Sequence, residues 1–366
     1  MGEAKIKKEH IEGKVIIVTG ANSGIGKATV EEIVKQNAAE RVILACRTKE
    51  KAEKAIEDIK KVQPKKNKKT ILDYETIELD DLKTVIRFVE NIKKRKEEKK
   101  IKAIDVLINN AGTIFQPPQR KKILYTNHIG HYLLVEELIK EKLLVEEHAK
   151  IVIVSSEAHR FIPYTKMKEV TLKDWFEKED IYTANTFQDY GLSKLLNIWH
   201  MKGLQKRYHE DQEEEEKRIH IYALHPGAIS SNLGYSNTKP ILKPLVWFFN
   251  LFLKTPKDGA QTTLHCAFSQ EAHDESGLYY SKIKVAPYKQ EYVEQEGRVD
   301  ELWEYSKQCV LEQLPDYTFN DSQQQPSSTT VVEKSNHDQI HLNEDDDDDN
   351  NQYDDNDDDD EEEEEE

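Results

Sequence analysis

Two side chains that could exchange a proton with a substrate lie four residues apart in the segment YGLSK, Tyr190 to Lys194. Positions i and i+4 lie on one face of a helix, one turn apart. A free phenol has a pKa of about 10, and a neighbouring ammonium group favours the phenolate. A phenol tuned in this way is a general acid for reducing a carbonyl and a general base for oxidising an alcohol. Taken alone, the pair is more typical of a solvated helix surface, so the rest of the chain must decide.

A glycine-rich segment, VTGANSGIG, runs from Val18 to Gly26 between an apolar run and a helical pattern. Glycines allow a tight turn, and the helix N-terminus behind them presents N–H groups to a negative charge. The spacing is T-G-x-x-x-G-x-G, which differs from the G-x-G-x-x-G of the usual dinucleotide fingerprint. We therefore predict that this segment binds the phosphates of a dinucleotide through Gly20, Asn22, Ser23, Gly24, Ile25 and Gly26.

The next predicted strand ends in ACR, and Arg47 lies 21 residues after Gly26. An acidic residue at this place holds the ribose 2′-hydroxyl of NAD, whereas an arginine suits the 2′-phosphate of NADP. Arg47 therefore predicts that NADP(H) is preferred, with NAD(H) as the weaker alternative. A plain surface arginine is the other interpretation of this position.

Short β-rich runs alternate with longer helical patterns along the chain. The predicted strands are Lys14–Thr19, Arg41–Ala45, Thr76–Leu79, Ile104–Asn109, Lys150–Val154 and Ile219–Leu224. The predicted helices are Gly24–Asn37, Lys49–Val62, Leu82–Lys96, Leu124–Leu144 and Asp189–Tyr208. Near-continuous apolar strands indicate a parallel sheet buried on both faces. The alternation predicts an α/β, doubly wound (Rossmann), mostly parallel sheet flanked by helices in a single domain.

With these motifs the sequence resembles the short-chain dehydrogenase/reductase family, whose cofactor loop is T-G-x-x-x-G-x-G. Its other signatures follow in the same order: NNAG, a helix with a catalytic asparagine, a catalytic serine, Y-x-x-x-K and a proline-glycine loop over the nicotinamide. The resemblance assigns the catalytic roles to Asn127, Ser156, Tyr190 and Lys194. It adds to the cofactor-binding residues Asn109, Ala111, Gly112, Tyr190, Lys194, Pro226, Gly227, Ile229 and Ser231.

Within the family, the segments ACR, NHIGHYLL, SSEAHRF, YGLSKLLNI and GAQTT resemble the retinol dehydrogenase-like and WW domain-containing oxidoreductase-like group. No WW domain is present in this sequence. The resemblance implies that Ser156 bonds the substrate oxygen, that Lys194 also holds the nicotinamide ribose, and that Asn127 positions a water. One departure is Glu78, where the family usually has an aspartate facing the adenine. The segment between Gly112 and Asn127, which borders the substrate entrance in the family, also differs from the family pattern. The identity of the substrate therefore cannot be inferred from the family.

The charge of the chain is concentrated at one end. Among 366 residues there are 53 Lys+Arg and 70 Asp+Glu, which gives a net charge of −17. Residues 344–366 hold 18 acidic residues and no basic one, so the rest of the chain is almost neutral. We predict a charged N-terminal arm (1–11), a dehydrogenase domain (12–318) and a disordered acidic tail (319–366). The sign of the tail disfavours nucleic acid as a partner.

Cysteine and histidine patterns provide no metal site and no disulfide framework. Cys46, Cys266 and Cys309 are few and far apart, which is typical of a reducing compartment. His128 and His131 are three apart on one predicted helix, but no carboxylate or cysteine completes a site. The charged N-terminus lacks the apolar core of a signal peptide, and no run is long enough to span a bilayer. We therefore expect a cytoplasmic protein.

The most apolar stretch is Ile241–Leu253, and in the family a substrate-covering helix lies in this region. It predicts a small lipophilic substrate such as a retinoid, a steroid or a long-chain aldehyde or ketone. Peripheral contact with a membrane surface, completion of the core, or a contact in a homodimer would explain it equally well. Two other functions stay open: reduction of a C=C bond of the protochlorophyllide reductase type, and a non-catalytic NADP-binding regulator that acts through the acidic tail.

Overall fold

The computed structural model describes residues 2–65, 69–114, 120–162, 169–178, 186–210, 212–227, 254–273 and 275–319. Within them one sheet has the strand order β3-β2-β1-β4-β5-β6-β7-β8. All neighbouring strands are parallel except β7 and β8, which are antiparallel. The strands are β1 (Val15–Thr19), β2 (Arg41–Cys46), β3 (Ile71–Thr76), β4 (Val106–Asn109), β5 (Lys150–Val154), β6 (His220–His225), β7 (Leu278–Ser281) and β8 (Lys284–Val285).

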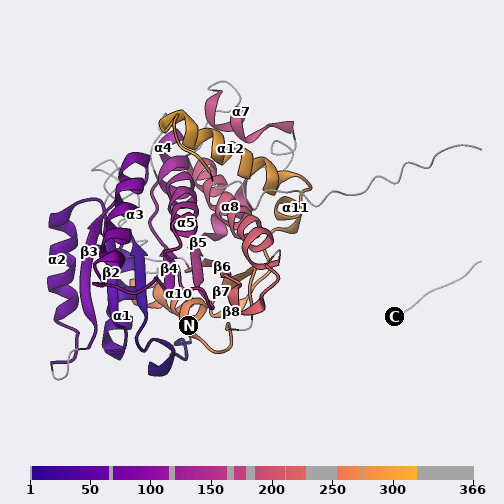
Figure 1. The fold of residues 1–366 in the computed structure, drawn as a ribbon. Coiled ribbons are helices and arrows are strands. Elements are labelled where there is room, and N and C mark those ends of the chain that lie inside the picture. Colours follow the sequence, from indigo (N-terminus) through magenta and orange to yellow (C-terminus); the bar gives the residue numbers. More distant parts are fainter. Residues whose placement is uncertain are drawn as a thin grey trace, which may run out of the picture. The chain divides into compact units, whose positions relative to one another are not determined.

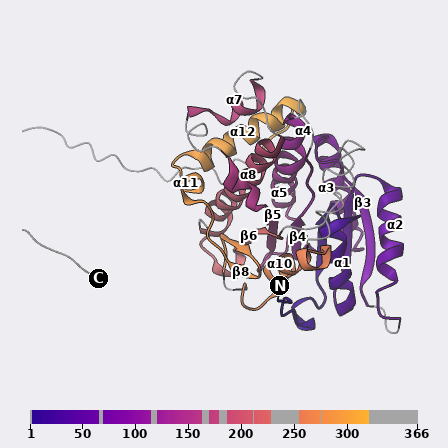
Figure 2. The same cartoon turned by 180° about the vertical axis from the view of Figure 1, so that it is seen from behind.

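The described α-helices begin with α1 after the first strand and end with α12 near the last described residue. They are α1 (Gly24–Gln36), α2 (Lys49–Lys60), α3 (Leu82–Glu97), α4 (Arg120–Leu124), α5 (Gly130–Lys140), α7 (Leu172–Glu177), α8 (Thr186–Gln205), α10 (Pro256–Phe268), α11 (Gln290–Val293) and α12 (Arg298–Gln313). In both views of the molecule, β3 and α2 lie at one side and α11 lies at the other (Figures 1 and 2). The prediction of a doubly wound, mostly parallel sheet is confirmed.

The sheet separates two apolar cores, and β1 contributes to both. Val15 and Ile17 pack in the core shared with α3, α5, α8 and α12. Ile16 and Val18 pack in the core shared with α1, α2 and α10. All four side chains are fully buried. Successive residues of a strand point to opposite faces, which explains why this strand is apolar up to its last residue, the buried Thr19.

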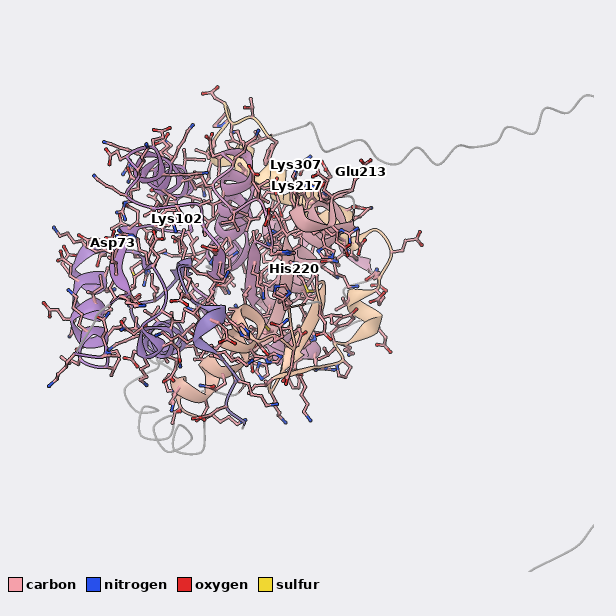
Figure 3. All side chains as sticks on the ribbon, turned by 60° about the horizontal axis from the view of Figure 1, so that its bottom comes forward. Asp73, Lys102, Glu213, Lys217, His220 and Lys307 are labelled. Atoms are coloured by element: carbon pink, nitrogen blue, oxygen red, sulfur yellow. The ribbon has the colours of Figure 1, made fainter. Side chains whose placement is uncertain are left out.

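The third strand is one place where the prediction was wrong. The apolar segment Thr76–Leu79 was expected to form it, but β3 is the less apolar Ile71–Thr76, paired with β2 from Arg41↔Ile71 onward. This strand lies at the edge of the sheet, so only part of each side chain is buried. Asp73 of this edge, labelled in Figure 3, accepts hydrogen bonds from Arg41 at 3.0 Å and Arg95 at 2.9 Å. A half-buried edge strand can carry such ion pairs in place of apolar side chains. A search for apolar runs therefore selects the wrong residues for β3.

The predicted helix Leu124–Leu144 is interrupted by one wide turn. The segment Tyr125–Ile129, termed η2, is a π-helix between α4 and α5, and the N–H of Gly130 donates to the carbonyl of Tyr125. A β-carbon at Gly130 would overlap the backbone carbonyl of Leu79, so the absence of a side chain lets this turn pack against the loop after β3. Such π turns occur mostly as single insertions and are frequent at functional sites. The turn carries Asn127.

The chain after β6 adds elements that the sequence patterns did not predict. They are the antiparallel pair β7 and β8 and the helices α10, α11 and α12. Helix α12 packs against α8, where Trp303 is buried, and Tyr132 of α5 contacts the Trp303 ring edge-on at 5.1 Å between centroids. Within the described ranges, no helix has the length and apolar character needed to cross a bilayer.

Candidate active site

The end of β1 and the loop after β4 are held together by one hydroxyl group. The Thr19 hydroxyl oxygen accepts from the backbone N–H groups of Asn110 and Ala111, each at 2.9 Å. The Asn110 side-chain amide donates back to the Thr19 carbonyl at 2.8 Å. Gly20 has a φ of 66°, and a β-carbon there would lie 3.0 Å from the Cα of Ala111. The two predicted cofactor motifs, TGANSGIG and NNAG, therefore form a single structural unit.

The helix that follows this loop begins without a cap of its own. Ser23 is the N-cap of α1, but its side chain makes no capping hydrogen bond, and the first turn has no acidic residue. A β-carbon on Gly26 would lie 2.6 Å from the Gly20 carbonyl oxygen, whereas one on Gly24 would have no atom within 4 Å. Gly26 therefore lets the helix approach the loop, and the space above Gly24 is open. Free N–H groups at a helix start bind phosphate, so these residues fit the pyrophosphate of a dinucleotide.

The end of β2 lies beside this loop. The Gly20 N–H donates to the Ala45 carbonyl at 2.8 Å, and the thiol of Cys46 bonds the backbone N–H groups of Ala21 and Asn22. Burial raises the pKa of that thiol to about 11, so it stays protonated. All three cysteines are buried and free.

Arg47 follows directly and is exposed, and it forms no hydrogen bond or ion pair with any described residue. Lys49, two residues after Arg47, pairs with Glu53 at 3.7 Å. An unpaired guanidinium beside the phosphate loop fits the 2′-phosphate of NADP, because it can bind a phosphate with two parallel hydrogen bonds.

The predicted acid–base residues meet where the start of α8 touches the turn after β5. Ser156 caps a short 3-10 helix, Glu157–Phe161, and its side chain lies close enough to the phenol of Tyr190 to lower the pKa of that phenol. Gly191 makes this approach feasible, because a β-carbon there would lie 2.6 Å from the Ala158 carbonyl oxygen. The Lys194 ammonium lies 5.7 Å from the centroid of the Tyr190 ring. The structure thus brings Ser156, Tyr190 and Lys194 together.

Burial sets the protonation of this pair. It raises the pKa of Tyr190 to about 12, against the opposing effect of the Ser156 side chain. It also lowers the pKa of Lys194 to about 8. The spacing of Tyr190 and Lys194 predicts a lowered pKa for the phenol, but desolvation of the phenolate is the larger effect in the protein by itself. Lys194 donates to the Val154 carbonyl at 2.9 Å, and a β-carbon on Gly112 would lie 3.3 Å from its nitrogen.

Asn127 connects the loop after β4 to the helix that carries Tyr190. Its side-chain nitrogen donates to the Thr113 carbonyl at 3.0 Å and to the Ser193 hydroxyl at 2.9 Å, and its side-chain oxygen accepts from the Thr113 N–H at 2.7 Å. The Ser193 hydroxyl in turn donates to the Tyr190 carbonyl at 2.7 Å. Both amide hydrogens are therefore used within the protein. Any water that Asn127 holds must bond its remaining acceptor positions.

Other predicted residues lie apart from this group. Glu78 is exposed, and its backbone forms a turn in which the Thr84 hydroxyl bonds both its N–H and its carbonyl at 2.8 Å. The side-chain amide of Asn109 is buried and has no hydrogen-bond partner among the described residues. Pro226 is buried, and Gly227 follows with a φ of 98°. The remaining residues of that loop and the apolar stretch lie outside the described residues: Ile229, Ser231 and Ile241–Leu253.

Sequence reasoning missed two hydroxyl groups that organise the site, Thr19 and Ser193. Both lie inside motifs that were recognised, TGANSGIG and YGLSK, next to residues that were assigned roles. A small hydroxyl residue beside a motif residue is the signal that could have identified them, because such residues bond nearby backbone groups. No group of histidine, cysteine and acidic side chains suited to a metal ion occurs in the described ranges.

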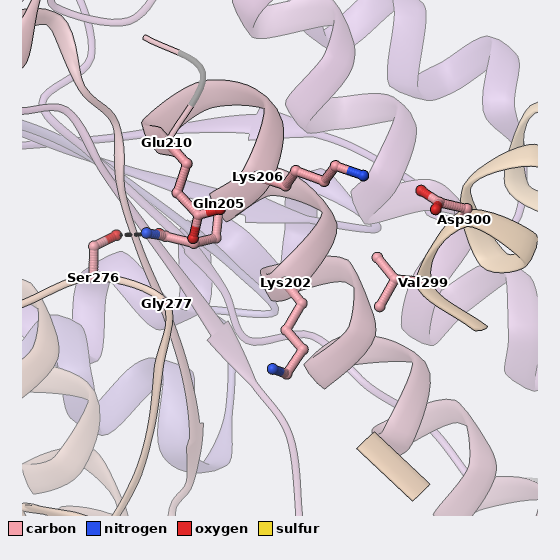
Figure 4. A pocket seen from close by; sticks show the side chains of 8 residues that line it. All are labelled: Lys202, Gln205, Lys206, Glu210, Ser276, Gly277, Val299 and Asp300. Atoms are coloured by element: carbon pink, nitrogen blue, oxygen red, sulfur yellow. Dashed lines mark hydrogen bonds between the residues drawn. The ribbon is translucent and has the colours of Figure 1, made fainter. Parts of the chain in front are cut away.

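A hollow of about 310 Å³ opens elsewhere, at the far end of α8 (Figure 4). It lies beside Lys202, which already pairs with Glu294 at 3.1 Å, and beside Gln205, which accepts from the Ser276 hydroxyl at 2.5 Å. Tyr190 precedes Lys202 by 12 residues, which is about 18 Å along a helix. This hollow is therefore separate from the candidate active site.

Comparison with known proteins agrees with this geometry. A family model described as short chain dehydrogenase matches residues 14–167. Human retinol dehydrogenase 11 is 33% identical over 317 residues, which are 84% of this chain and 88% of that protein. Human retinol dehydrogenase 12 is 34% identical over 283 residues, which are 75% of this chain and 79% of that protein.

Solved structures share the fold at lower identity. An oxidoreductase from E. coli has a TM-score of 0.54 with 18% identity, covering 76% of this chain and 98% of that one. An angucycline C-6 ketoreductase with bound NADP has a TM-score of 0.53 with 20% identity, covering 75% of this chain and 95% of that one. At these identities the likeness concerns the fold alone.

Proposed function

This chain belongs to the short-chain dehydrogenase family of oxidoreductases, and we propose that it interconverts an alcohol and a carbonyl on a lipophilic substrate with NADP(H) as its cofactor. The observation that carries the proposal is the place of the Tyr190 phenol, where the Ser156 side chain lowers its pKa against the larger effect of burial and the Lys194 ammonium lies 5.7 Å from the ring centroid. A proton donor, a hydroxyl that can hold an oxygen atom and a buried cation are the groups that carbonyl reduction needs.

The roles of the three side chains follow from their protonation. When bound, the nicotinamide cofactor supplies the hydride in reduction and accepts it in oxidation. Tyr190 holds its proton at neutral pH, because its pKa is raised, and gives it to the substrate oxygen in reduction. Ser156 donates a hydrogen bond to the same oxygen. One N–H of the Lys194 ammonium donates to the Val154 carbonyl, so two N–H groups remain for the ribose hydroxyls of the cofactor. The ammonium also keeps a positive charge near the phenol.

The lipophilic substrate is supported by two exposed aromatic rings near the reacting groups. Phe161 and Phe187 are 64% and 44% exposed, and their ring centroids lie 5.8 Å apart. Phe161 lies on the turn that begins with Ser156, and Phe187 lies one helical turn before Tyr190. The relatives named retinol dehydrogenase make a retinoid the first member of this substrate class to try.

The decisive experiment follows NADPH consumption by the purified full chain with retinal, a long-chain alkanal, a steroid ketone and, as the polar control, glyceraldehyde. We expect turnover with at least one apolar carbonyl and little with glyceraldehyde. Tyr190→Phe should lower kcat by roughly 10²–10⁴-fold, the usual cost of losing a general acid, while NADPH still binds. Near-normal turnover by this variant would contradict the proposed mechanism.

The same experiment separates the other two functions. Product analysis with an α,β-unsaturated aldehyde distinguishes an allylic alcohol, which the proposal predicts, from the saturated carbonyl of a C=C reductase. A non-catalytic regulator would bind NADPH, as measured by quenching of tryptophan fluorescence, and consume none with any carbonyl of the panel.

A further inference from the structure

One buried histidine connects the cofactor loop to the π-helical turn η2. His131 lies on α5, and its side chain is 2% exposed. Its Nε2 lies 2.9 Å from the Thr19 hydroxyl, and its Nδ1 lies 3.3 Å from the backbone carbonyl oxygen of Asn127. The ring therefore spans two of the motifs that form the candidate active site.

The partners of Thr19 decide which ring nitrogen carries the proton. Its hydroxyl oxygen already accepts two backbone N–H donors, those of Asn110 and Ala111. A hydroxyl group has two acceptor positions and one hydrogen, so the hydrogen remains for Nε2 of His131. The contact of that hydroxyl with the Ile108 carbonyl is longer, at 3.4 Å. Nε2 is then the acceptor, and the proton is on Nδ1, which donates to the carbonyl of Asn127.

We propose that His131, as the neutral Nδ1–H tautomer, is a positioning residue that fixes Asn127 against the end of β1. This inference rests on the proposed function for its effect on turnover. Asn127 holds Ser193, and Ser193 bonds the carbonyl of Tyr190, so a displaced Asn127 shifts the turn that carries the phenol. Burial keeps the ring neutral by lowering the pKa of His131 to about 3.

A second histidine provides a matched control. His128 lies three residues earlier and is fully buried, but its Nε2 bonds the Ser306 hydroxyl of α12 at 2.8 Å instead of Thr19. His131→Phe removes both hydrogen bonds of interest, and His128→Phe removes a bond of similar burial elsewhere. His131→Asn places an amide N–H where Nδ1–H lies, which restores the donor to the carbonyl of Asn127.

Turnover should separate these variants. We expect His131→Phe to lower kcat at least tenfold with less than a threefold change in the KM for the carbonyl, and His131→Asn to recover most of the loss. His128→Phe should lower the thermal midpoint as much as His131→Phe and change kcat by less than threefold. Equal effects of the two phenylalanine variants on kcat, or no recovery with asparagine, would overturn the positioning role.

A measurement that needs no turnover keeps this inference distinct from the proposed function. Histidine labelled with ¹⁵N in the ring reports the tautomer by two-bond ¹H–¹⁵N correlation spectra, and the signals absent in His131→Asn identify the residue. We expect the pattern of a neutral ring protonated on Nδ1 from pH 6 to pH 8. A ring protonated on Nε2, or a charged ring at pH 6, would refute the inference even if the enzyme is active.

Discussion

Two helices that pack side by side on the same face of the sheet begin in opposite ways. Helix α10 starts with a complete capping box, in which Thr255 and Asp258 bond each other's backbone N–H groups at 3.1 and 3.2 Å, and Pro256 occupies the first turn. Helix α1 starts with Ser23, which caps nothing, and has glycines and no acidic residue in its first turn.

The difference indicates which helix start is reserved for a ligand. A capping box satisfies backbone N–H groups and places a carboxylate at the positive end of the helix dipole. The same groups at α1 remain available for a phosphate, and the nearby Arg47 has no partner among the residues that the structure describes. We infer that the capped start of α10 stabilises the fold. The uncapped start of α1 and the buried Lys194 of α8 lower the stability of the fold and serve binding and chemistry instead. Substitutions at three positions, Lys194, Ser23 and Thr255, test that contrast, and a cofactor titration tests its central element.

The largest effect on stability is expected from Lys194→Met. Burial lowers the pKa of Lys194 from 10.5 to about 8, so the folded protein carries fewer protons than the unfolded chain between these values. The free energy of unfolding therefore rises with pH across this window, and below pH 8 the buried charge costs up to about 3 kcal/mol. Asn197 still bonds the Val154 carbonyl at 3.1 Å in the variant. Urea unfolding at pH 7 should show a more stable and inactive protein.

The advantage of Lys194→Met should shrink as the pH rises from 8 toward 10.5, because the folded lysine is already neutral above pH 8 and the unfolded lysine loses its proton near pH 10.5. Lys202→Met is the control on the same helix, because Lys202 is partly exposed and paired with Glu294. A loss of stability in Lys194→Met at pH 7, similar to that of the control, would remove the argument that the active-site edge is destabilising.

The next effect concerns the open start of α1. Asp and Asn are equally good N-cap residues, so Ser23→Asp and Ser23→Asn should both preserve the thermal midpoint. The added carboxylate should repel the pyrophosphate and raise the Kd for NADPH by about 10- to 100-fold, since charges about 5 Å apart near a protein surface interact by a few kcal/mol. Isothermal titration of both variants provides the measurement. Equal Kd values for the two variants would place the phosphates elsewhere.

The smallest effect is expected at the closed helix start. Thr255→Ala removes the cap of α10 and should lower the free energy of unfolding by about 1 kcal/mol. Because Thr255 belongs to no cofactor motif, the Kd for NADPH should remain within twofold of wild type. Chemical denaturation and the same titration provide both values. A large loss of NADPH affinity in a folded Thr255→Ala protein would abolish the contrast between the two helices.

Much of this contrast could be predicted from the sequence, because glycine spacing and apolar strands are local signals. The fold class, β1, β2 and the helix after TGANSGIG were predicted within a few residues. The strand β3 was misplaced, since an edge strand is only half apolar, and its true position depends on ion pairs with Arg41 and Arg95. Long-range ion pairs of this kind have no signal in a single sequence.

For the candidate site, the sequence indicated which residues could take part. It did not indicate the contacts that those residues make in the fold. The π-helical turn that carries Asn127 depends on the packing of Gly130 against Leu79, which no periodicity encodes. The raised pKa of Tyr190 likewise depends on burial by distant segments, whereas the spacing to Lys194 suggested the opposite direction. Spacing identifies which groups can meet, and burial decides their protonation.

The central claim, that the open helix start and Arg47 form an NADP(H) site, is tested most directly by titrating NADPH and NADH into wild type and Arg47→Asp. Hydrogen bonds to a charged group are worth about 1.5–3 kcal/mol, so wild type should bind NADPH roughly 10- to 100-fold more tightly than NADH. Arg47→Asp should lose or reverse that preference, because an aspartate can hold the free 2′-hydroxyl of NADH instead. Equal affinity of wild type for the two cofactors would contradict the account.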